Sequence, residues 1–289
     1  MIIVTGATGQ LGGRIVERLL DRIPAAGVGV SVRDPEKARS LVDRGVRVRQ
    51  GGFTDPAGLA HAFEGASQVL IVSVDRMGEE AVRQHRTAVD AAVAAGARRI
   101  VYTAHMGASP TSRFQACRDH AATEEALAAS GVAWTSLRNG FHADSGLGFL
   151  AQGLDAGEVA LPADGPVCWT AHADLAEAAA VVLADECPRF EGPTPPLTAT
   201  EALTFADLVA LAGELTGRPI TRTTAADDTF RAHLVAGGVP VETADQLLGI
   251  FTAAREGEFA TPDPTLAKLL GREPASLRTL LRERLAGNP

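Results

Sequence analysis

Two kinds of apolar pattern alternate along the first half of the chain. Short runs that are almost entirely apolar are typical of strands buried on both faces of a parallel sheet, and stretches with apolar residues about every three or four positions are typical of amphipathic helices. The strands predicted in this way lie at 2–4, 28–33, 46–50, 68–72, 99–104 and 132–137. The helices predicted between them lie at 11–20, from 34 onward, and at 56–64, 79–95 and 118–129. This alternation predicts an α/β fold with a doubly wound parallel sheet, the Rossmann fold.

The pattern loses its regularity after residue 138, where Gly, Pro and Asp divide shorter segments. Helices are predicted there at 174–184, 205–215, 227–236, 243–255 and 276–285, with one strand at 219–223. The alanine-rich helix at 174–184 is suited to return to the sheet. We therefore predict a cofactor-binding Rossmann domain over residues 1–139 and a smaller, mostly helical substrate lobe over residues 140–289, with 166–185 returning to the Rossmann sheet.

The chain starts with a strand, a glycine turn and a helix. Its glycines follow a G-x-x-G-x-x-G spacing, which differs from the common G-x-G-x-x-G fingerprint, so the interpretation depends on the βαβ context. Glycine permits a tight turn and a close approach of phosphate, and the free N–H groups of the new helix attract negative charge. We predict that a dinucleotide is bound by Thr5, Gly6, Thr8, Gly9, Gln10, Leu11 and Gly12.

Arg33 stands at the end of the second predicted strand. An acidic residue at this point would bind the ribose 2′-hydroxyl of NAD, whereas a guanidinium can pair with the 2′-phosphate of NADP. Asp34 is one position later and suits the N-cap of the helix that begins at Pro35. We therefore predict NADP(H) as the cofactor, with Lys37 adding charge to the same pocket. The alternatives are a solvated loop arginine and a plain surface lysine.

Phe53 and Asp55 follow the third predicted strand and are candidates to border the adenine. Asp55 precedes Pro56, however, and this pair is equally typical of a helix start with an aspartate cap. Both interpretations of Asp55 stay open on the sequence alone.

Charge and cysteine content exclude some other classes of protein. The formal net charge of -8, without any basic run, argues against nucleic-acid binding. The three cysteines lack C-x-x-C spacing, which supports neither a disulfide framework nor a zinc site, so no metal is predicted. Glycines and charged residues interrupt the apolar start before it reaches membrane length. We expect a cytoplasmic protein without a membrane segment.

The glycine motif together with Val32–Ala38 resembles the NmrA-like branch of the atypical short-chain dehydrogenase/reductases. Further motifs are similar to the NADPH-dependent quinone oxidoreductases of type 2 in that branch; they lie at 84–86, 94–97, 101–103, 137–141 and 266–272. The resemblance covers nearly the whole chain. It implies that Thr103, Asn139, Gly140 and Phe141 also border the cofactor, with Phe141 as an aromatic wall beside the nicotinamide and substrate. A turn with a core phenylalanine is the alternative for the last three residues.

The wider superfamily reduces carbonyls with a Tyr-x-x-x-Lys pair, which this chain lacks. On the family pattern Ala116 takes the tyrosine position and His120 the lysine position, while the single tyrosine, Tyr102, lies in a predicted buried strand. Reduction of a ketone gives a strongly basic alkoxide that needs a positioned acid, whereas a quinone or conjugated enone gives a delocalised oxyanion that a modest donor or water can satisfy. The absence of the pair therefore favours quinone-like acceptors.

Three histidines are the candidate catalytic donors: His105, His120 and His142. Each is predicted near the carboxyl ends of the strands, where a doubly wound sheet binds its ligands, and neutral histidine can donate to an oxyanion. A structural role is the alternative for each of them. Trp169 is a further candidate to approach the cleft from the second lobe.

Two classes of function follow from these observations. The first is an NADPH-dependent oxidoreductase that transfers hydride to a small quinone or enone, as a monomer or homodimer. The second is an NADP-binding redox sensor of the NmrA type that acts on a protein partner without turnover. An accessory isomerase or reductase of polyketide-like aromatic compounds is a third possibility. The chain carries no long charged or amphipathic appendage of the kind that a sensor would use, which favours the enzyme.

Overall fold

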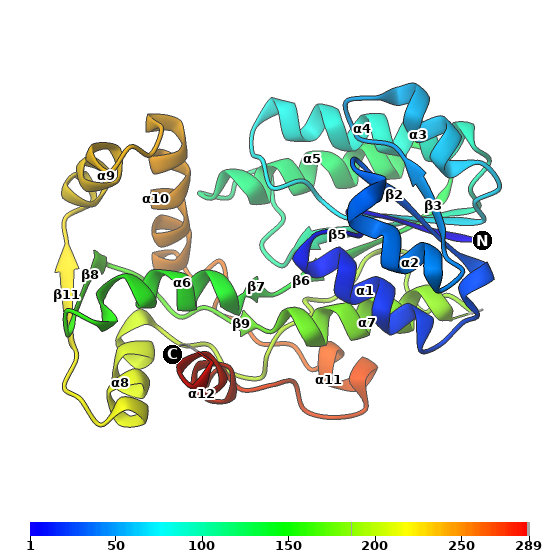
Figure 1. The fold of residues 1–289 in the computed structure, drawn as a ribbon. Helices are drawn as coiled ribbons and strands as arrows, with labels where there is room; N and C mark the ends of the chain where they lie inside the picture. The colour runs from blue at the N-terminus through cyan, green and yellow to red at the C-terminus, as the bar shows by residue number, and fades with distance from the viewer. Residues whose placement is uncertain (186, 288–289) are drawn as a thin grey trace.

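The computed structural model describes residues 1–185 and 187–287, so the last two residues of the predicted second lobe lie outside it. Its centre is a parallel sheet of seven strands in the order β10-β6-β5-β4-β1-β2-β3 (Figure 1). The strands are β1 (Ile2–Thr5), β2 (Val28–Val32), β3 (Arg47–Gln50), β4 (Gln68–Ile71), β5 (Arg99–His105), β6 (Ala133–Asn139) and β10 (Gly192–Pro193). The predicted doubly wound Rossmann sheet is confirmed, and β10 adds one strand that the sequence pattern did not predict.

Helices cover both faces of this sheet, and each face has its own apolar core. On one face, the core of β1, β2 and β4 side chains is closed by α1 (Gln10–Leu20) and by α7 (His172–Ala184), which pack on each other. On the other face lie α3 (Pro56–Phe63), α4 (Glu79–Ala94) and α5 (Gln115–Ala129). The 3-10 turn at Pro35–Ala38 and α2 (Arg39–Asp43) join β2 to β3. Helix α7 contains the alanine-rich stretch 174–184, for which a return to the sheet is predicted.

The second lobe is built from α6 (Ala143–Leu154), β8 (Glu158–Pro162), α8 (Phe205–Thr216), β11 (Thr221–Ala225), α9 (Asp227–Ala236), α10 (Val241–Arg255) and α12 (Leu277–Ala286). Strands β8 and β11 form a separate parallel pair. Aromatic rings fill the lobe's core, where Phe149, Phe205 and Phe251 lie with ring centroids 5.3 to 5.9 Å apart. The boundary between residues 139 and 140 stays a prediction, but the lobe has a core of its own.

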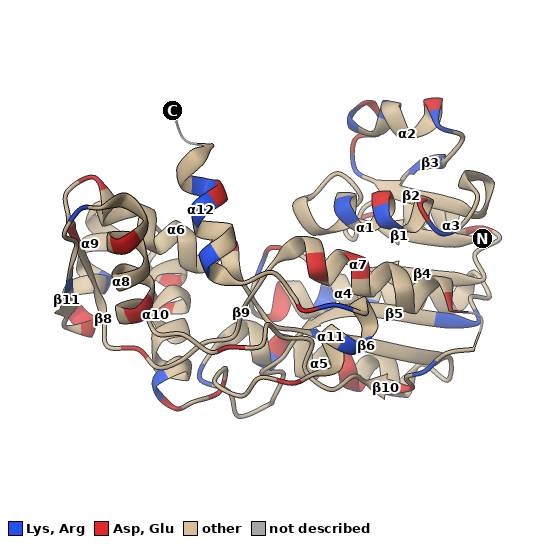
Figure 2. Ribbon diagram, turned by 90° about the horizontal axis from the view of Figure 1, so that it is seen from below, with Lys and Arg blue, Asp and Glu red and all other residues tan. Residues whose placement is uncertain are grey.

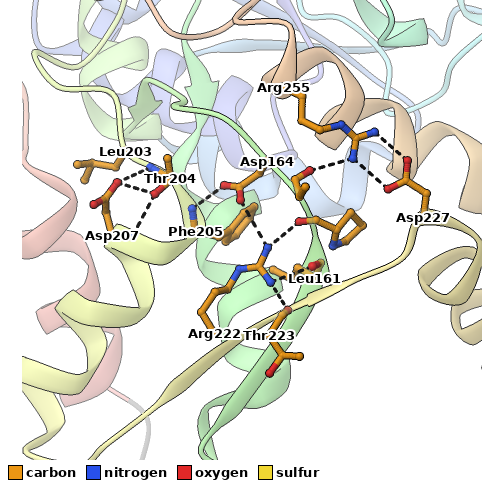
Figure 3. Close-up of polar contacts among 12 residues, drawn as sticks. Leu161, Asp164, Leu203, Thr204, Phe205, Asp207, Arg222, Thr223, Asp227 and Arg255 are labelled. Carbon is orange, nitrogen blue, oxygen red and sulfur yellow. Dashed lines mark hydrogen bonds and ion pairs between the residues drawn. The ribbon is translucent and has the colours of Figure 1, made fainter.

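A half-buried ion pair and the hydrogen bonds around it hold the connections of this lobe together (Figure 3). Asp164 accepts from the N–H of Phe205 at the start of α8 (2.7 Å) and lies 3.5 Å from Arg222 of β11. The Arg222 guanidinium also donates to the carbonyls of Leu161 (2.8 Å) and Pro162 (2.6 Å). These contacts hold the β8–β11 pair against the beginning of α8, which Thr204 caps through a reciprocal contact with Asp207.

The two lobes meet just beyond the carboxyl end of β6. There β7 (Phe141–His142) pairs in parallel with β9 (Trp169–Thr170). Gly140 separates β6 from β7, and a Cβ at this position would lie 2.2 Å from the Thr170 hydroxyl. Only glycine fits there without displacing β9.

Several elements differ from the prediction. The sequence pattern missed α6, because Gly146, Gly148 and Gly153 dilute its apolar face. It also missed β8, the short strands β7 and β9, and the short helix α11 (Thr265–Leu270), which packs on α7. The strand predicted at 219–223 is observed two residues later, as β11. The ring of Trp169 is buried between Phe141 and Phe205, and its approach to the cleft stays a prediction.

Charged residues of both signs are interspersed along the ribbon of both lobes (Figure 2), in keeping with the absence of a basic run in the sequence. Within the described part of the chain, no helix is both long and apolar enough to span a membrane.

Candidate functional site

The loop between β1 and α1 is shaped by its glycines. Gly6 has a φ of +63°, a conformation that side chains rarely adopt, and a Cβ at Gly12 would lie 2.3 Å from the Gly6 carbonyl oxygen. The turn and the helix start are therefore packed so closely that Gly12 has no room for a side chain. Gly9 N–H closes the turn on the Gly6 carbonyl (2.9 Å).

The start of α1 offers free donors to a ligand. Gly9 is the N-cap and provides no side chain to accept from the first N–H groups, and no acidic residue stands in the first turn. Backbone N–H groups and the helix dipole together form an anion site. Thr8 and Gln10 are exposed beside it, whereas Leu11 is buried and anchors the helix. This cradle fits the pyrophosphate of a dinucleotide.

Arg33 lies at the end of β2 with its side chain exposed. Its aliphatic part passes over Gly52, and among the described residues no carboxylate forms an ion pair with its guanidinium. Lys37 is exposed as well and lies 4.0 Å from Asp34. A guanidinium without an acidic partner beside the cradle fits a 2′-phosphate, as the position of Arg33 predicts.

Asp55 is the N-cap of α3, and its carboxylate accepts from the N–H of Gly58 at 3.0 Å. Of the two interpretations, the structure shows the cap, while contact with an adenine stays a prediction. Phe53 is half-buried, with its ring edge-on to His85 at 6.5 Å.

Thr5 and Thr103 have their hydroxyls committed within the protein. Thr5 accepts from the N–H of Val72 (2.9 Å), and Thr103 accepts from the N–H of Ser73 (2.9 Å). Both threonines are buried. They hold the chain just after β4 against β1 and β5.

The residues at and after the end of β6 are the next predicted part of the site. Asn139 is buried and its side-chain oxygen has no hydrogen-bond partner among the described residues. The Gly140 N–H donates to the Leu197 carbonyl (2.8 Å). Phe141 is buried within an aromatic cluster with Phe114 and Phe259. Phe141 thus has the predicted core position, while its role as an aromatic wall beside the nicotinamide stays a prediction.

His105 is packed among these rings, with centroid distances of 5.0 Å to Phe141 and 5.1 Å to Phe259. Its Nδ1 accepts from the N–H of Gly107 at 3.1 Å, so the neutral ring carries its proton on Nε2. Nε2 is buried and lacks a hydrogen-bond partner in the described chain. Burial and then the nearby His142 lower the pKa of His105 to about 3, which keeps the ring neutral.

His120 lies on α5, and its ring centroid is 6.4 Å from that of His105. Its Nδ1 is 2.6 Å from the Tyr102 hydroxyl. Burial, followed by the neighbouring histidines, lowers the pKa of His120 well below its usual value. Two of the three predicted donors are therefore brought together as neutral rings.

His142 lies on β7, with its ring 4.2 Å from that of His172. The Nδ1 of His172 is 2.6 Å from Asp144 in the first turn of α6. Burial is the main cause that lowers the pKa of His142 to about 4, with His172 adding to the effect. All three predicted donors gather at the carboxyl ends of β5 and β6, where a doubly wound sheet binds its ligands.

No role in the site was predicted for His85, Tyr102 or His172. His85 and Tyr102 are both buried, and the Tyr102 hydroxyl lies 3.3 Å from Nδ1 of His85 and 2.6 Å from Nδ1 of His120. The one available signal was a single tyrosine in an apolar strand, because a buried hydroxyl requires a polar partner. Within the described residues, no group of three potential ligands could hold a metal ion.

Comparisons with known proteins agree with this geometry. The family model described as NAD(P)H-binding matches residues 6–186. Quinone oxidoreductase 2 of Escherichia coli is 34% identical over 278 residues, which cover 96% of this chain and 96% of the relative. An NmrA-like family domain-containing oxidoreductase of Aspergillus flavus is 31% identical over 294 residues, which cover 99% of this chain and 95% of the relative.

A crystal structure of the NADPH-dependent quinone oxidoreductase of Escherichia coli, complexed with NADPH, is similar over the whole fold. The TM-score is 0.92 at 33% identity, covering 99% of this chain and all of that one. These findings confirm the family predicted from the motifs. The chain belongs to the NAD(P)H-binding family, in its NmrA-like branch.

Proposed function

We propose that this protein is an NADPH-dependent oxidoreductase that reduces small quinones or conjugated enones. The observation that carries the proposal is His105, whose Nε2–H is buried among aromatic rings at the end of β5 and has no hydrogen-bond partner among the described residues. A buried donor without a partner is costly, which favours a site where a ligand oxygen accepts from it. The aromatic side chains around it suit a flat, conjugated ligand.

The residues of the first half fit the cofactor. The glycine loop and the uncapped start of α1 would hold the pyrophosphate, and Arg33 would pair with the 2′-phosphate that distinguishes NADPH from NADH. Lys37 would add positive charge at the same edge. When bound, NADPH supplies the hydride, so the protein's task is to orient the acceptor and stabilise the charge that develops on it.

Neutral histidines are suited to that task. Because the pKa of His105 is near 3 and that of His142 near 4, both rings stay neutral and act as hydrogen-bond donors instead of cations at neutral pH. A neutral imidazole is a poor acid, but the delocalised oxyanion of a reduced quinone or enone needs only a hydrogen bond, and water can supply the proton. A simple ketone would need the missing tyrosine and lysine.

Tyr102 cannot replace the missing acid. Its side chain is fully buried, and burial raises the pKa of its hydroxyl well above the usual range. Ala116, which takes the family's tyrosine position, has no proton to donate. Neutral histidines in place of a tyrosine and lysine pair therefore support quinones or conjugated enones as the acceptors.

Oxidation of NADPH in the presence of different acceptors tests the proposal. Purified protein is mixed with NADPH and, in parallel, 1,4-naphthoquinone, 2-cyclohexenone and the saturated ketone cyclohexanone, and absorbance at the cofactor band is followed. We expect turnover with the conjugated acceptors and none with the saturated ketone. Tight NADPH binding without turnover of any acceptor would refute the enzyme and favour the NADP sensor, and turnover of cyclohexanone would refute the acceptor class.

A further inference from the structure

We propose that His85 and Tyr102 are positioning residues that fix His120 with its proton on Nε2, so that His120 is a hydrogen-bond donor to the reduced acceptor. The inference rests on the proposed function, because it names a further residue of that reaction. It follows from a chain of hydrogen bonds that starts at the backbone N–H of Val74 and ends at His120.

The donor-to-acceptor direction of these hydrogen bonds is determined at the Val74 end. The N–H of Val74 can only donate, and it lies 3.1 Å from Nε2 of His85. Nε2 of His85 is therefore an acceptor, and the neutral ring must carry its proton on Nδ1. The His85 ring is neutral because burial lowers its pKa to about 4.

Two oxygens face Nδ1 of His85, the hydroxyls of Thr123 at 3.0 Å and Tyr102 at 3.3 Å. The Thr123 hydroxyl donates its own proton to the carbonyl of Asp119 (2.8 Å), so its oxygen is free to accept. The Tyr102 hydroxyl cannot donate to His85, since Nδ1 already holds a proton. Its closest neighbour is Nδ1 of His120, at 2.6 Å, a distance that suits an O–H donor better than an N–H donor.

The Tyr102 hydroxyl therefore donates to His120, and Nδ1 of His120 is an acceptor. The neutral ring of His120 is left with its proton on Nε2, for which the described residues provide no hydrogen-bond partner. In the opposite arrangement the Tyr102 proton would turn to the Thr123 hydroxyl, and Nδ1–H of His120 would donate to the Tyr102 oxygen at 2.6 Å, which is unusually close for an N–H donor. The backbone amide of Val74 and the short contact between Tyr102 and His120 together determine which nitrogen of His120 donates.

The chain of hydrogen bonds from Val74 to His120 orients the His120 ring but does not conduct protons. A transfer from Tyr102 to His120 would leave a buried tyrosinate, which His85 could not reprotonate because its other nitrogen is fixed by a backbone amide. His120 therefore keeps its proton and contributes a hydrogen bond, while the proton that the product takes up comes from water. No bond to His120 forms or breaks.

The state of the ring can be measured without turnover. In protein labelled with ¹⁵N-histidine, NMR should show that the proton of His120 is on Nε2 and that Nδ1 accepts a hydrogen bond. A proton on Nδ1 would overturn the proposal, and this experiment needs no variant and no activity. It separates a failure of this inference about His120 from a failure of the proposed function.

Tyr102→Phe tests the consequence. We expect the Nδ1 signal of His120 to leave its hydrogen-bonded position and kcat with 1,4-naphthoquinone to fall about fivefold, the effect of one ordinary hydrogen bond, with unchanged affinity for NADPH. The matched control is Ser136→Ala, because Ser136 is the register partner of Tyr102 on β6 and its buried hydroxyl bonds Glu124 instead. An unchanged signal and kcat in Tyr102→Phe, or an equal fall in kcat in Ser136→Ala, would overturn the proposal.

Discussion

Acid should destabilise this protein at pH values well above those at which its carboxylates titrate, because the folded protein buries neutral histidines. His85 is 2% exposed, and burial lowers its pKa from 6.5 to about 4. The unfolded chain then binds a proton between these two values that the folded protein does not bind. A group of this kind contributes its full stability above pH 6.5 and loses it as the pH falls toward 4.

The magnitude follows from the shift. Between pH 7 and pH 5, one histidine with these two pKa values lowers the free energy of unfolding by about 2 kcal/mol. Because burial lowers the pKa of His105, His120 and His142 as well, all three act in the same direction. The combined loss is a large part of the roughly 5 to 15 kcal/mol that stabilises an ordinary domain.

Urea unfolding at pH 7 and pH 5, followed by tryptophan fluorescence, measures this loss, since Trp134 is in the sheet and Trp169 in the second lobe. In His85→Gln the side-chain amide oxygen can accept from the backbone N–H of Val74, but the glutamine side chain does not titrate. We expect the difference between the two pH values to shrink by about 2 kcal/mol in this variant. Equal stability of the wild type at both pH values, or the same difference in the variant, would refute the reasoning.

Three further substitutions test other parts of the structure. Arg33→Asp should weaken NADPH binding about tenfold to a hundredfold and leave NADH nearly unaffected in a fluorescence titration, whereas equal effects on both would exclude Arg33 from the 2′-phosphate site. Gly12→Ala should lower the free energy of unfolding by roughly 1 to 3 kcal/mol or more, since the added Cβ meets the Gly6 carbonyl. The control Gly148→Ala in α6, where the position has open space around it, should be neutral or stabilising. A similar loss of stability in both variants would contradict the close packing at Gly12. Thr204→Ala should cost about 1 kcal/mol in urea unfolding through loss of the α8 cap, and an unchanged midpoint would show that the cap contributes little.

The sequence predicted the sheet well because its central strands, such as β1, β2 and β5, are buried on both faces and therefore nearly all apolar. The second lobe was less predictable for physical reasons. Helix α6 carries glycine at positions that pack against other groups, as Gly146 does against Trp169, so its apolar pattern is weak. The strands β7, β9 and β10 have two residues each, too few to show any period.

For the site, spacing alone predicted the cradle and the position of Arg33, because both follow from the order of strands and turns. The three histidines were located by the same rule. The roles of His85 and Tyr102 could not be predicted, since they depend on distances between α4, β5 and α5 and on a single backbone amide. Periodicity places a residue on a face but does not identify its hydrogen-bond partner.

The path of the chain between the lobes limits how the enzyme can be recombined. After β6 it enters the second lobe, returns to the sheet for α7 and β10, leaves again for α8 to α10, and returns once more for α11 before ending in α12. The second lobe is thus assembled from three separate stretches of sequence. A chimera that takes its acceptor specificity from a relative must exchange all three stretches together, and a single cut after residue 139 would yield two fragments that both lack part of their cores.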